Sequence, residues 1–247
     1  MSITSPAELE GMRRAGKLVA RALRKMEAAA RPGATTAEVD GAGAAFLRRH
    51  GARSAPQFTY GFPGFNLISV NDQIVHGVPG ARRLAPGDVV KLDVTAELDG
   101  FIADAAVTIV LPPASAAATR LRQCAIDAFE RGREAARPGR PVRDIGRAVE
   151  REVVRQGFSV VRSLTGHGVG RTIHEPPNVP NFDDPSARTI LTEGLVLTIE
   201  PLITERPARV VEEKDGWTLR AHNKALAAHY EHTVMITAHG AEILTAA

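Results

Sequence analysis

An internal repeat constrains the fold of this chain more than any other feature. The pentapeptide Ala-Ala-Arg-Pro-Gly occurs at residues 29–33 and again at 135–139, an offset of 106 residues. An offset of 107 then aligns residues 87–93 with 194–200, and each segment is a glycine, an apolar run and a carboxylate, Asp93 in one and Glu200 in the other. The chain is therefore predicted to fold as two similar α+β halves related by a pseudo-two-fold axis.

Composition permits both halves to share one body. The chain has 247 residues, of which 44% are apolar, enough to bury a sizeable core. The seam between the halves is Pro-Pro-Ala-Ser at 112–115, which is too short to separate independent domains. We expect a single domain over residues 1–247, with internal halves at about 1–113 and 114–247.

The same composition limits the compartment and the partners. No run approaches the roughly 20 apolar residues of a membrane span, and the first residues lack a signal-peptide pattern, so a cytoplasmic protein without membrane contact is expected. We also expect a monomer. Cys124 is the single cysteine, which excludes an intrachain disulfide and favours a buried apolar role.

The net charge of the chain is only +3, and no block of basic residues indicates specific nucleic-acid binding. One helix face carries Arg21, Arg24 and Lys25, which is compatible with transient contact with an acidic surface such as a ribosome.

Hydrophobic periodicity predicts the order of the elements. The segment 5–8, Ser-Pro-Ala-Glu, is a capping box that begins a long helix, which ends at the Arg-Pro-Gly break at 31–33. Further helices are predicted at about 36–51, 116–136 and 142–157, and strands at about 67–70, 89–96, 101–111, 159–164, 195–199 and 231–237. Residues 175–188 contain four prolines and are predicted to form an irregular loop that walls or covers a site.

The predicted hairpin brings two acids together. If Asp99-Gly100 forms a two-residue turn, strand alternation places Asp93 and Asp104 on one face, diagonally adjacent. Two carboxylates on the core side of an apolar ladder repel each other and lose hydration, and a bound divalent cation removes that cost. The hairpin alone leaves open the alternative that one or both acids face solvent.

The second half supplies matching groups. Glu231 precedes an apolar run as Asp104 does, and Val-His-Gly-Val at 75–78 is echoed by Gly-His-Gly-Val at 166–169, which places His76 and His167 in matching positions. Four acids and one or two histidines are thus predicted to converge. Such a carboxylate-rich set without a thiolate favours Mn²⁺ or Fe²⁺, although Co²⁺ and Zn²⁺ bind similar ligands. Two ions about 3.5–4 Å apart with a bridging hydroxide form a hydrolytic centre near neutral pH.

Several ordered motifs extend this pattern over nearly the whole chain. They are Ser-Val-Asn at 69–71, Val-His-Gly-Val-Pro at 75–79, Leu-Asp-Val-Thr at 92–95, Asp-Gly-Phe at 99–101, Thr-Gly-His-Gly-Val-Gly-Arg at 165–171, His-Glu-Pro-Pro at 174–177, Thr-Ile-Glu-Pro at 198–201, Asp-Gly-Trp-Thr at 215–218 and Tyr-Glu-His-Thr at 230–233. In these motifs the chain resembles the type I methionine aminopeptidases, which have the pita-bread fold. The resemblance implies an antiparallel sheet covered by helices from the two repeated halves.

The resemblance also implies a metal centre. The family's five ligands fall on Asp93, Asp104, His167, Glu200 and Glu231, with none missing. Asp104 and Glu231 would bridge two divalent ions. Asp93 would bind one ion, and His167 and Glu200 would bind the other. Glu200 would in addition carry protons while a hydroxide activated by the ions attacks the carbonyl carbon of the first residue.

Two further histidines receive catalytic roles from the resemblance. His76 and His174 would steady the substrate amide and the developing oxyanion, and donors aimed at developing charge often contribute more to the rate of acyl transfer than any other group. The other histidines are expected at the surface or behind the ligands; they are His50, His222, His229, His232 and His239.

The implied substrate is the N-terminal methionine of nascent chains whose second residue is small. Selectivity for methionine needs an apolar slot of limited depth. By resemblance the candidate lining residues are Phe58, Thr59, Phe62, Leu67, Ile173 and Trp217. The chain departs from the family pattern at Leu67, where bacterial relatives often carry cysteine, around residues 58–62, where the tyrosines are rearranged, and at Ala105, where a hydroxyl residue is common. These departures concern pocket shape and rate rather than the metal chemistry.

Three other functions fit the sequence less well. A proline-specific aminopeptidase or prolidase usually carries an additional N-terminal domain, and the catalytic pattern starts too early here for one. A pita-bread protein that binds other macromolecules without catalysis would lack metal ligands, whereas all five are present. A Rossmann-like cofactor enzyme is disfavoured because His167 interrupts the glycine run.

Overall fold

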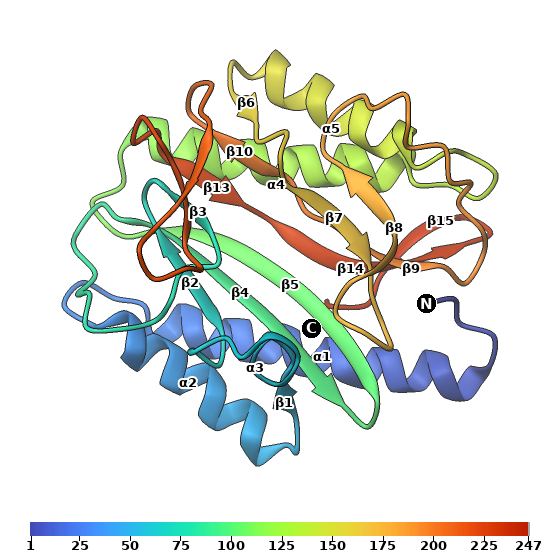
Figure 1. Cartoon of the computed structure of the whole chain (residues 1–247), viewed down its shortest axis with the longest axis horizontal. Coiled ribbons are helices and arrows are strands. Elements are labelled where there is room, and N and C mark those ends of the chain that lie inside the picture. Colours follow the sequence, from blue (N-terminus) through green and yellow to red (C-terminus); the bar gives the residue numbers. More distant parts are fainter. Residues whose placement is uncertain (247) are drawn as a thin grey trace.

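A curved antiparallel sheet of nine strands runs through both halves of the computed structural model, which describes residues 1–246 (Figure 1). Seven strands follow the order β1-β4-β5-β14-β9-β7-β8, while β2 pairs with β4 and β15 with β14. The bounds are β1 Arg53–Ser54, β2 Leu67–Val70, β4 Val89–Leu98, β5 Phe101–Val110, β7 Thr165–Gly168, β8 Glu175–Pro180, β9 Val196–Ile199, β14 Glu231–Thr237 and β15 Gly240–Ile243. The two halves meet where β5 pairs with β14.

Two small sheets complete the β-structure of the described residues. One has the order β13-β10-β6 and the other the order β11-β12-β3. Their strands are β3 Gln73–Val75, β6 Ser159–Val160, β10 Leu202–Thr204, β11 Val210–Glu212, β12 Leu219–Ala221 and β13 Ala227–His229. Each small sheet therefore combines segments that lie far apart in the sequence.

Four long helices cover the large sheet in two pairs, one pair for each half (Figure 1). The first pair is α1 Pro6–Ala29 and α2 Thr36–Arg49, and the second is α4 Ala116–Ala135 and α5 Arg143–Arg155. All four were predicted, and their ends lie within a few residues of the predicted positions. A short helix that periodicity did not predict, α3 Ala55–Tyr60, precedes β2.

The start of α1 differs in detail from the predicted capping box. Ser5 Oγ accepts the N–H of Glu8 at 3.3 Å, as expected for an N-cap. The Glu8 carboxylate, however, accepts the N–H of Thr4 at 2.8 Å rather than that of Ser5, so the reciprocal bond is missing. The complete capping box lies at the start of α2, between Thr35 and Glu38.

The repeated segments adopt the same local geometry. Gly33 and Gly139 have φ values of 91° and 79°, a region that favours glycine. The N–H of Gly33 donates to the carbonyl of Leu84 at 2.7 Å, and that of Gly139 donates to the carbonyl of Leu191 at 2.9 Å. Leu84 and Leu191 are related by the same 107-residue offset as the strands. The repeat thus preserves a long-range contact as well as a helix end.

Each helix pair buries its apolar face against its own half of the sheet. One cluster of buried side chains joins α1 and α2 to β4 and β5, and a second joins α4 and α5 to β9 and β14. Cys124 is fully buried in the second cluster, and burial raises the pKa of its thiol to about 12. The predicted apolar role of Cys124 is confirmed. Among the helices of residues 1–246, none combines the length and the apolar character that a membrane span requires.

The proline-rich segment is the main departure from the predicted elements. Residues 175–180 form β8, which pairs with β7 in a register that places Pro180 opposite Thr165. The strand lies at the edge of the sheet and its register shifts between His167 and Gly168, and edge positions and bulges are the places in a sheet where proline is tolerated. The prediction of an irregular loop is therefore wrong for residues 175–180. The strand predicted at 159–164 is shorter than expected, since β6 covers only Ser159–Val160.

Candidate metal centre

The β4–β5 hairpin presents two aspartates on one face of the sheet. Asp99 and Gly100 form the two-residue turn, with φ values of 51° and 82°. The strand register places Asp104 opposite Thr95, and therefore diagonally next to Asp93. Because side chains alternate along a strand, both carboxylates project to the same side. The register predicted from the sequence is confirmed.

The neighbouring strands add two glutamates to this face. Glu231 of β14 pairs with Ala106 of β5, which itself pairs with Asp93, so the two acids lie in one row across the sheet. Strand β9 pairs with β14 and ends one residue before Glu200, which brings Glu200 level with Glu231. All four carboxylates are at least nine-tenths buried.

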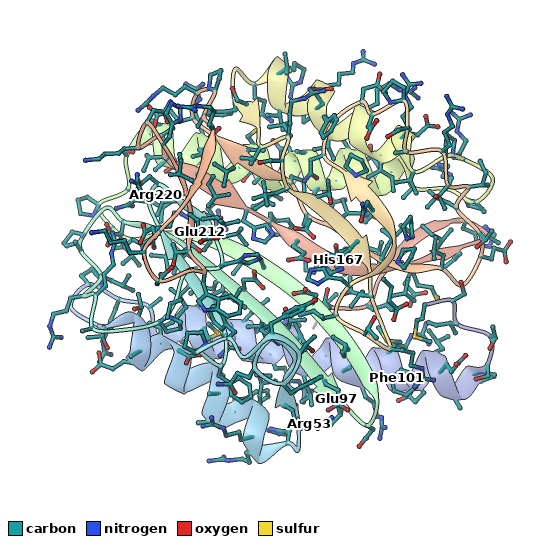
Figure 2. All side chains as sticks on the ribbon, viewed as in Figure 1. Arg53, Glu97, Phe101, His167, Glu212 and Arg220 are labelled. Atoms are coloured by element: carbon teal, nitrogen blue, oxygen red, sulfur yellow. The ribbon has the colours of Figure 1, made fainter. Side chains whose placement is uncertain are left out.

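His167 joins the carboxylates from β7. Its N–H donates to Thr198 Oγ1 at 3.0 Å, which fixes the strand beside β9. Its Nε2 lies 3.5 Å from Glu200 Oε1 and 3.9 Å from Asp104 Oδ2. Figure 2 shows His167 over the middle of the sheet, with Glu97 and Phe101 at the hairpin tip away from it. The five predicted ligand residues are thus brought together.

Burial makes this arrangement costly without a cation. Burial, reinforced by the neighbouring negative charges, raises the pKa values of Asp93, Glu200 and Glu231 well above their usual range. Burial likewise raises the pKa of Asp104 to about 7, against hydrogen bonds that lower it. Burial lowers the pKa of His167 to about 4, so its ring is neutral at neutral pH and brings no compensating charge. A cation is the group that would remove this cost.

The donor set fits divalent metal ions. Among the described residues, two groups of three could each hold an ion, Asp93–His229–Glu231 and Asp104–His167–Glu231, with donor atoms within 4.8 Å of one another. Glu231 belongs to both groups, as a bridging ligand would. Asp93 Oδ1 is buried without a hydrogen-bond partner in residues 1–246, so it is available as a donor. Carboxylate and imidazole donors suit Mn²⁺, Fe²⁺, Co²⁺ and Zn²⁺.

His229 is a site residue that the sequence did not single out. It was expected at the surface or behind the ligands, and the first alternative is wrong because the side chain is only 1% exposed. Its Nε2 lies 3.3 Å from Glu231 Oε2, yet neither ring nitrogen has a partner with hydrogen-bond geometry among residues 1–246. Burial lowers its pKa to about 3. The sequence signal was its position two residues before Glu231, on the approach to the same face.

Two threonines orient the carboxylates and were also missed as site residues. Thr95 Oγ1 donates to Asp104 Oδ1 at 2.9 Å, and Thr198 Oγ1 donates to Glu200 Oε1 at 2.9 Å. Thr95 lies two residues from Asp93 on β4, and Thr198 lies two residues from Glu200, so alternation places each threonine on the same face as an acid. Hydrogen bonds of this kind fix which oxygen faces a ligand and which faces the protein.

A cavity of about 650 Å³ opens over the carboxylates. Four of the predicted apolar residues line it, namely Phe62, Leu67, Ile173 and Trp217, together with His76 and His174. The rings of Phe62 and Trp217 meet edge to face at 5.3 Å. His76 has a φ of 60°, which is uncommon for a residue other than glycine and is found at functional sites. Burial lowers its pKa to about 4, so the ring is neutral.

Two predicted pocket residues lie elsewhere. Phe58 and Thr59 are exposed and do not line the cavity, and the Phe58 ring stacks under the Arg53 guanidinium at 4.8 Å. The reason is that residues 55–60 form α3, whose inward face repeats every three or four residues. Pro56 and Tyr60 occupy that face and line the cavity instead. The prediction for Phe58 and Thr59 is therefore wrong.

Metal binding is expected to depend on pH in a definite direction. Chelator-treated protein should gain more thermal stability from Mn²⁺ at pH 8 than at pH 6. The raised pKa values mean that the metal-free site holds protons at pH 6, and the ion must displace them. Each displaced proton weakens apparent binding about 10-fold per pH unit below the pKa. Calorimetric Tm values with and without Mn²⁺ check this, and equal shifts at both pH values would contradict it.

The sequence matches a known family of metallopeptidases over most of its length. The model of metallopeptidase family M24 matches residues 10–238. Methionine aminopeptidase 2 of Bacillus subtilis is 42% identical over 247 residues, which cover 99% of each chain. The methionine aminopeptidase of Clostridium perfringens is 41% identical over 238 residues, or 96% of each chain.

Solved structures show the same fold. The methionine aminopeptidase of Thermotoga maritima superposes with a TM-score of 0.96 at 35% identity and covers 100% of both chains. The prolidase of Pyrococcus furiosus superposes with a TM-score of 0.81 at 24% identity, covering 99% of this chain and 65% of the prolidase, which shows a shared fold alone. The predicted pita-bread fold is confirmed by these matches.

Proposed function

Since the chain belongs to the methionine aminopeptidases of metallopeptidase family M24, we propose that it removes the N-terminal methionine of nascent polypeptides whose second residue is small. The strongest support for this proposal is that four buried carboxylates and a neutral His167 converge beneath an apolar cavity of about 650 Å³. A hydrolytic metal centre and a slot for an apolar side chain therefore share one site.

Two divalent ions are the proposed cofactors. The residues that would hold them are Asp93, Asp104, His167, Glu200 and Glu231, of which Glu231 belongs to both groups of converging donors. When bound, the ions supply Lewis acidity and lower the pKa of water toward neutrality. Thr95 and Thr198 hold Asp104 and Glu200 in fixed orientations by their hydrogen bonds at 2.9 Å.

Glu200 is the proposed proton carrier. Burial and the charge of Asp104 raise the pKa of Glu200 well above its usual range, which favours the uptake of a proton by this carboxyl group. Glu200 would accept the proton of the attacking water and deliver it to the amine nitrogen released when the peptide C–N bond breaks. Thr198 keeps one oxygen of Glu200 oriented, which leaves the other for this transfer.

His76 and His174 are proposed to steady the reacting peptide group. Burial lowers the pKa of both rings, so each is neutral and can donate one N–H to a developing oxyanion. Tyr60 supports this arrangement, because its hydroxyl lies 2.6 Å from His174 Nδ1 at the cavity wall. A bond there leaves Nε2 of His174 free to face the substrate.

The cavity also accounts for the proposed selectivity. Leu67 pairs across the strands with Asp93, so an apolar surface lies directly beside the carboxylates. Phe62 and Trp217 extend that surface, which suits an unbranched apolar side chain such as methionine. The Tyr60–His174 pair narrows the space next to the scissile bond, which supports a preference for a small second residue.

Selectivity for the second residue tests this proposal. The protein reconstituted with Mn²⁺ or Co²⁺ is expected to release methionine from Met-Gly-Met and Met-Ala-Ser and to spare Met-Leu-Ser, whose second side chain does not fit beside Tyr60 and His174. Free methionine is measured by chromatography. Metal-dependent release of other N-terminal residues with methionine spared would overturn the substrate assignment.

A further inference from the structure

A second groove continues from the wall of the active-site cavity. Ser163 and Leu164 line both the cavity and a neighbouring depression of about 820 Å³. We define this exit groove by residues 158–160 and 162–164 on one wall and 207–210 on the other, with Glu150 and Val154 of α5 and Leu219 of β12 completing its lining. Figure 1 shows β6 beside α5 in this part of the molecule. The groove has no role in the chemistry proposed above.

The exit groove exposes apolar side chains. Val154 is 63% exposed although it belongs to a helix whose other valines are buried. Phe158, Val160 and Val210 are only half-buried along the walls. Apolar surface that is open to solvent and continuous with a substrate cavity marks a surface for an extended ligand.

The groove wall also contains a free strand edge. Within residues 1–246, β6 is the last strand of the sheet β13-β10-β6. The N–H of Val161 donates to the carbonyl of Leu202 in β10 at 2.9 Å. Because successive main-chain groups of a strand point to opposite edges, the N–H and C=O of Val160 point away from β10. An edge of this kind accepts a further strand.

We propose that the polypeptide substrate, beyond its first few residues, leaves the cavity over Ser163 and Leu164 and adds as a strand to the edge of β6 in the exit groove. This inference rests on the proposed function, since the segment that would bind in the exit groove is the remainder of the same substrate. Residues 161–164 form a turn in which the N–H of Leu164 donates to the carbonyl of Val161 at 3.4 Å, so the cavity wall at Leu164 lies one turn away from Val160. We therefore expect the pairing to begin soon after the substrate leaves the cavity, at roughly its fourth to sixth residues.

Strand addition suits the substrates of such an enzyme. Main-chain hydrogen bonds form with the backbone of the substrate and do not depend on its side chains, so a strand edge can bind polypeptides of many sequences. Apolar side chains of the walls add contact area beside Arg162 and Arg209, without requiring a particular substrate side chain. The cavity then selects the substrate by its first two residues, and the exit groove holds the backbone further along the same substrate.

The test compares peptide lengths on the wild-type protein reconstituted with Mn²⁺. The kcat/KM for methionine release from the octapeptide Met-Ala-Ser-Val-Thr-Val-Ser-Ser is expected to exceed that for Met-Ala-Ser about 10-fold, as two main-chain hydrogen bonds would give. N-methylation of residues 4 to 6 should abolish that gain, whereas N-methylation of residue 8 should not. V160P, which removes the outward N–H, should reduce the octapeptide-to-tripeptide ratio toward one.

The outcomes separate this proposal from the proposed function. Equal kcat/KM for both lengths, with methionine released from each, overturns the exit groove and leaves the aminopeptidase activity standing. A full gain from the octapeptide methylated at residues 4 to 6 overturns strand addition. Release of methionine from neither peptide overturns the proposed function itself. The methylated peptides need no protein variant, so the test does not depend on the folding of V160P.

Discussion

Asp104→Asn is expected to lower methionine release at least about 10³-fold, because the ions and the water they activate are lost together. Asp104 Oδ2 lies 3.9 Å from His167 Nε2, and the other oxygen of Asp104 is already held by Thr95, so an amide cannot supply the negative charge of the carboxylate at this position. Metal content measured by mass spectrometry should fall in parallel with turnover. The metal-free variant should be at least as stable as wild type, since one of four mutually repelling buried carboxylates has been removed.

The matched control is Asp99→Asn in the same hairpin. Asp99 is at the turn, its side chain is 59% exposed, and asparagine tolerates its positive φ. This variant should keep both metal and activity. If Asp104→Asn retains tightly bound metal and more than about a tenth of wild-type turnover, Asp104 is not a ligand and the proposed centre is wrong.

His76→Ala is expected to separate catalysis from metal binding. Turnover should fall about 10²–10³-fold, the usual effect of removing one donor to a developing oxyanion, while metal stoichiometry stays at the wild-type value. The reason is that His76 lines the cavity but belongs to neither group of converging metal donors. Steady-state kinetics on Met-Ala-Ser, together with metal analysis of the same samples, measures both quantities.

His239→Ala serves as the control for the loss of an imidazole. His239 is exposed in the turn between β14 and β15, outside the cavity, and its removal should change neither quantity. Loss of an ion from His76→Ala would identify His76 as a ligand. It would contradict the proposal that His167 binds metal and His76 contacts the substrate.

Much of the metal site could be predicted because it depends on local rules. A two-residue turn at Asp99-Gly100 fixes the register of the hairpin, and the period of two then fixes which side chains share a face. The repeat places Glu200 and Glu231 at positions that match Asp93 and Asp104, so the same argument applies to them. The ligand set itself came from the family resemblance. The structure brings the donor atoms of four of these residues into two groups that could each hold an ion, and Glu200 Oε1 lies 3.5 Å from His167 Nε2 beside them.

The missed features depend on tertiary context. Phe58 and Thr59 point away from the cavity because α3 forms, and a six-residue helix has too few turns to show periodicity. Residues 175–180 form a strand despite their prolines because the sheet places them at its edge. His229 reaches the carboxylates from β13, a strand of a separate small sheet. Its spacing of two residues from Glu231 was the only local signal, and that spacing does not show that the side chain is buried.

If a metal centre on these carboxylates hydrolyses the bond after an N-terminal methionine, turnover must depend on bound metal. Methionine release from Met-Ala-Ser by chelator-treated wild-type protein, before and after Mn²⁺ is restored, measures this dependence most directly. Release is expected to be negligible without metal and to recover until two ions are bound per chain. Undiminished release by protein that contains no bound metal would contradict a metal-dependent mechanism.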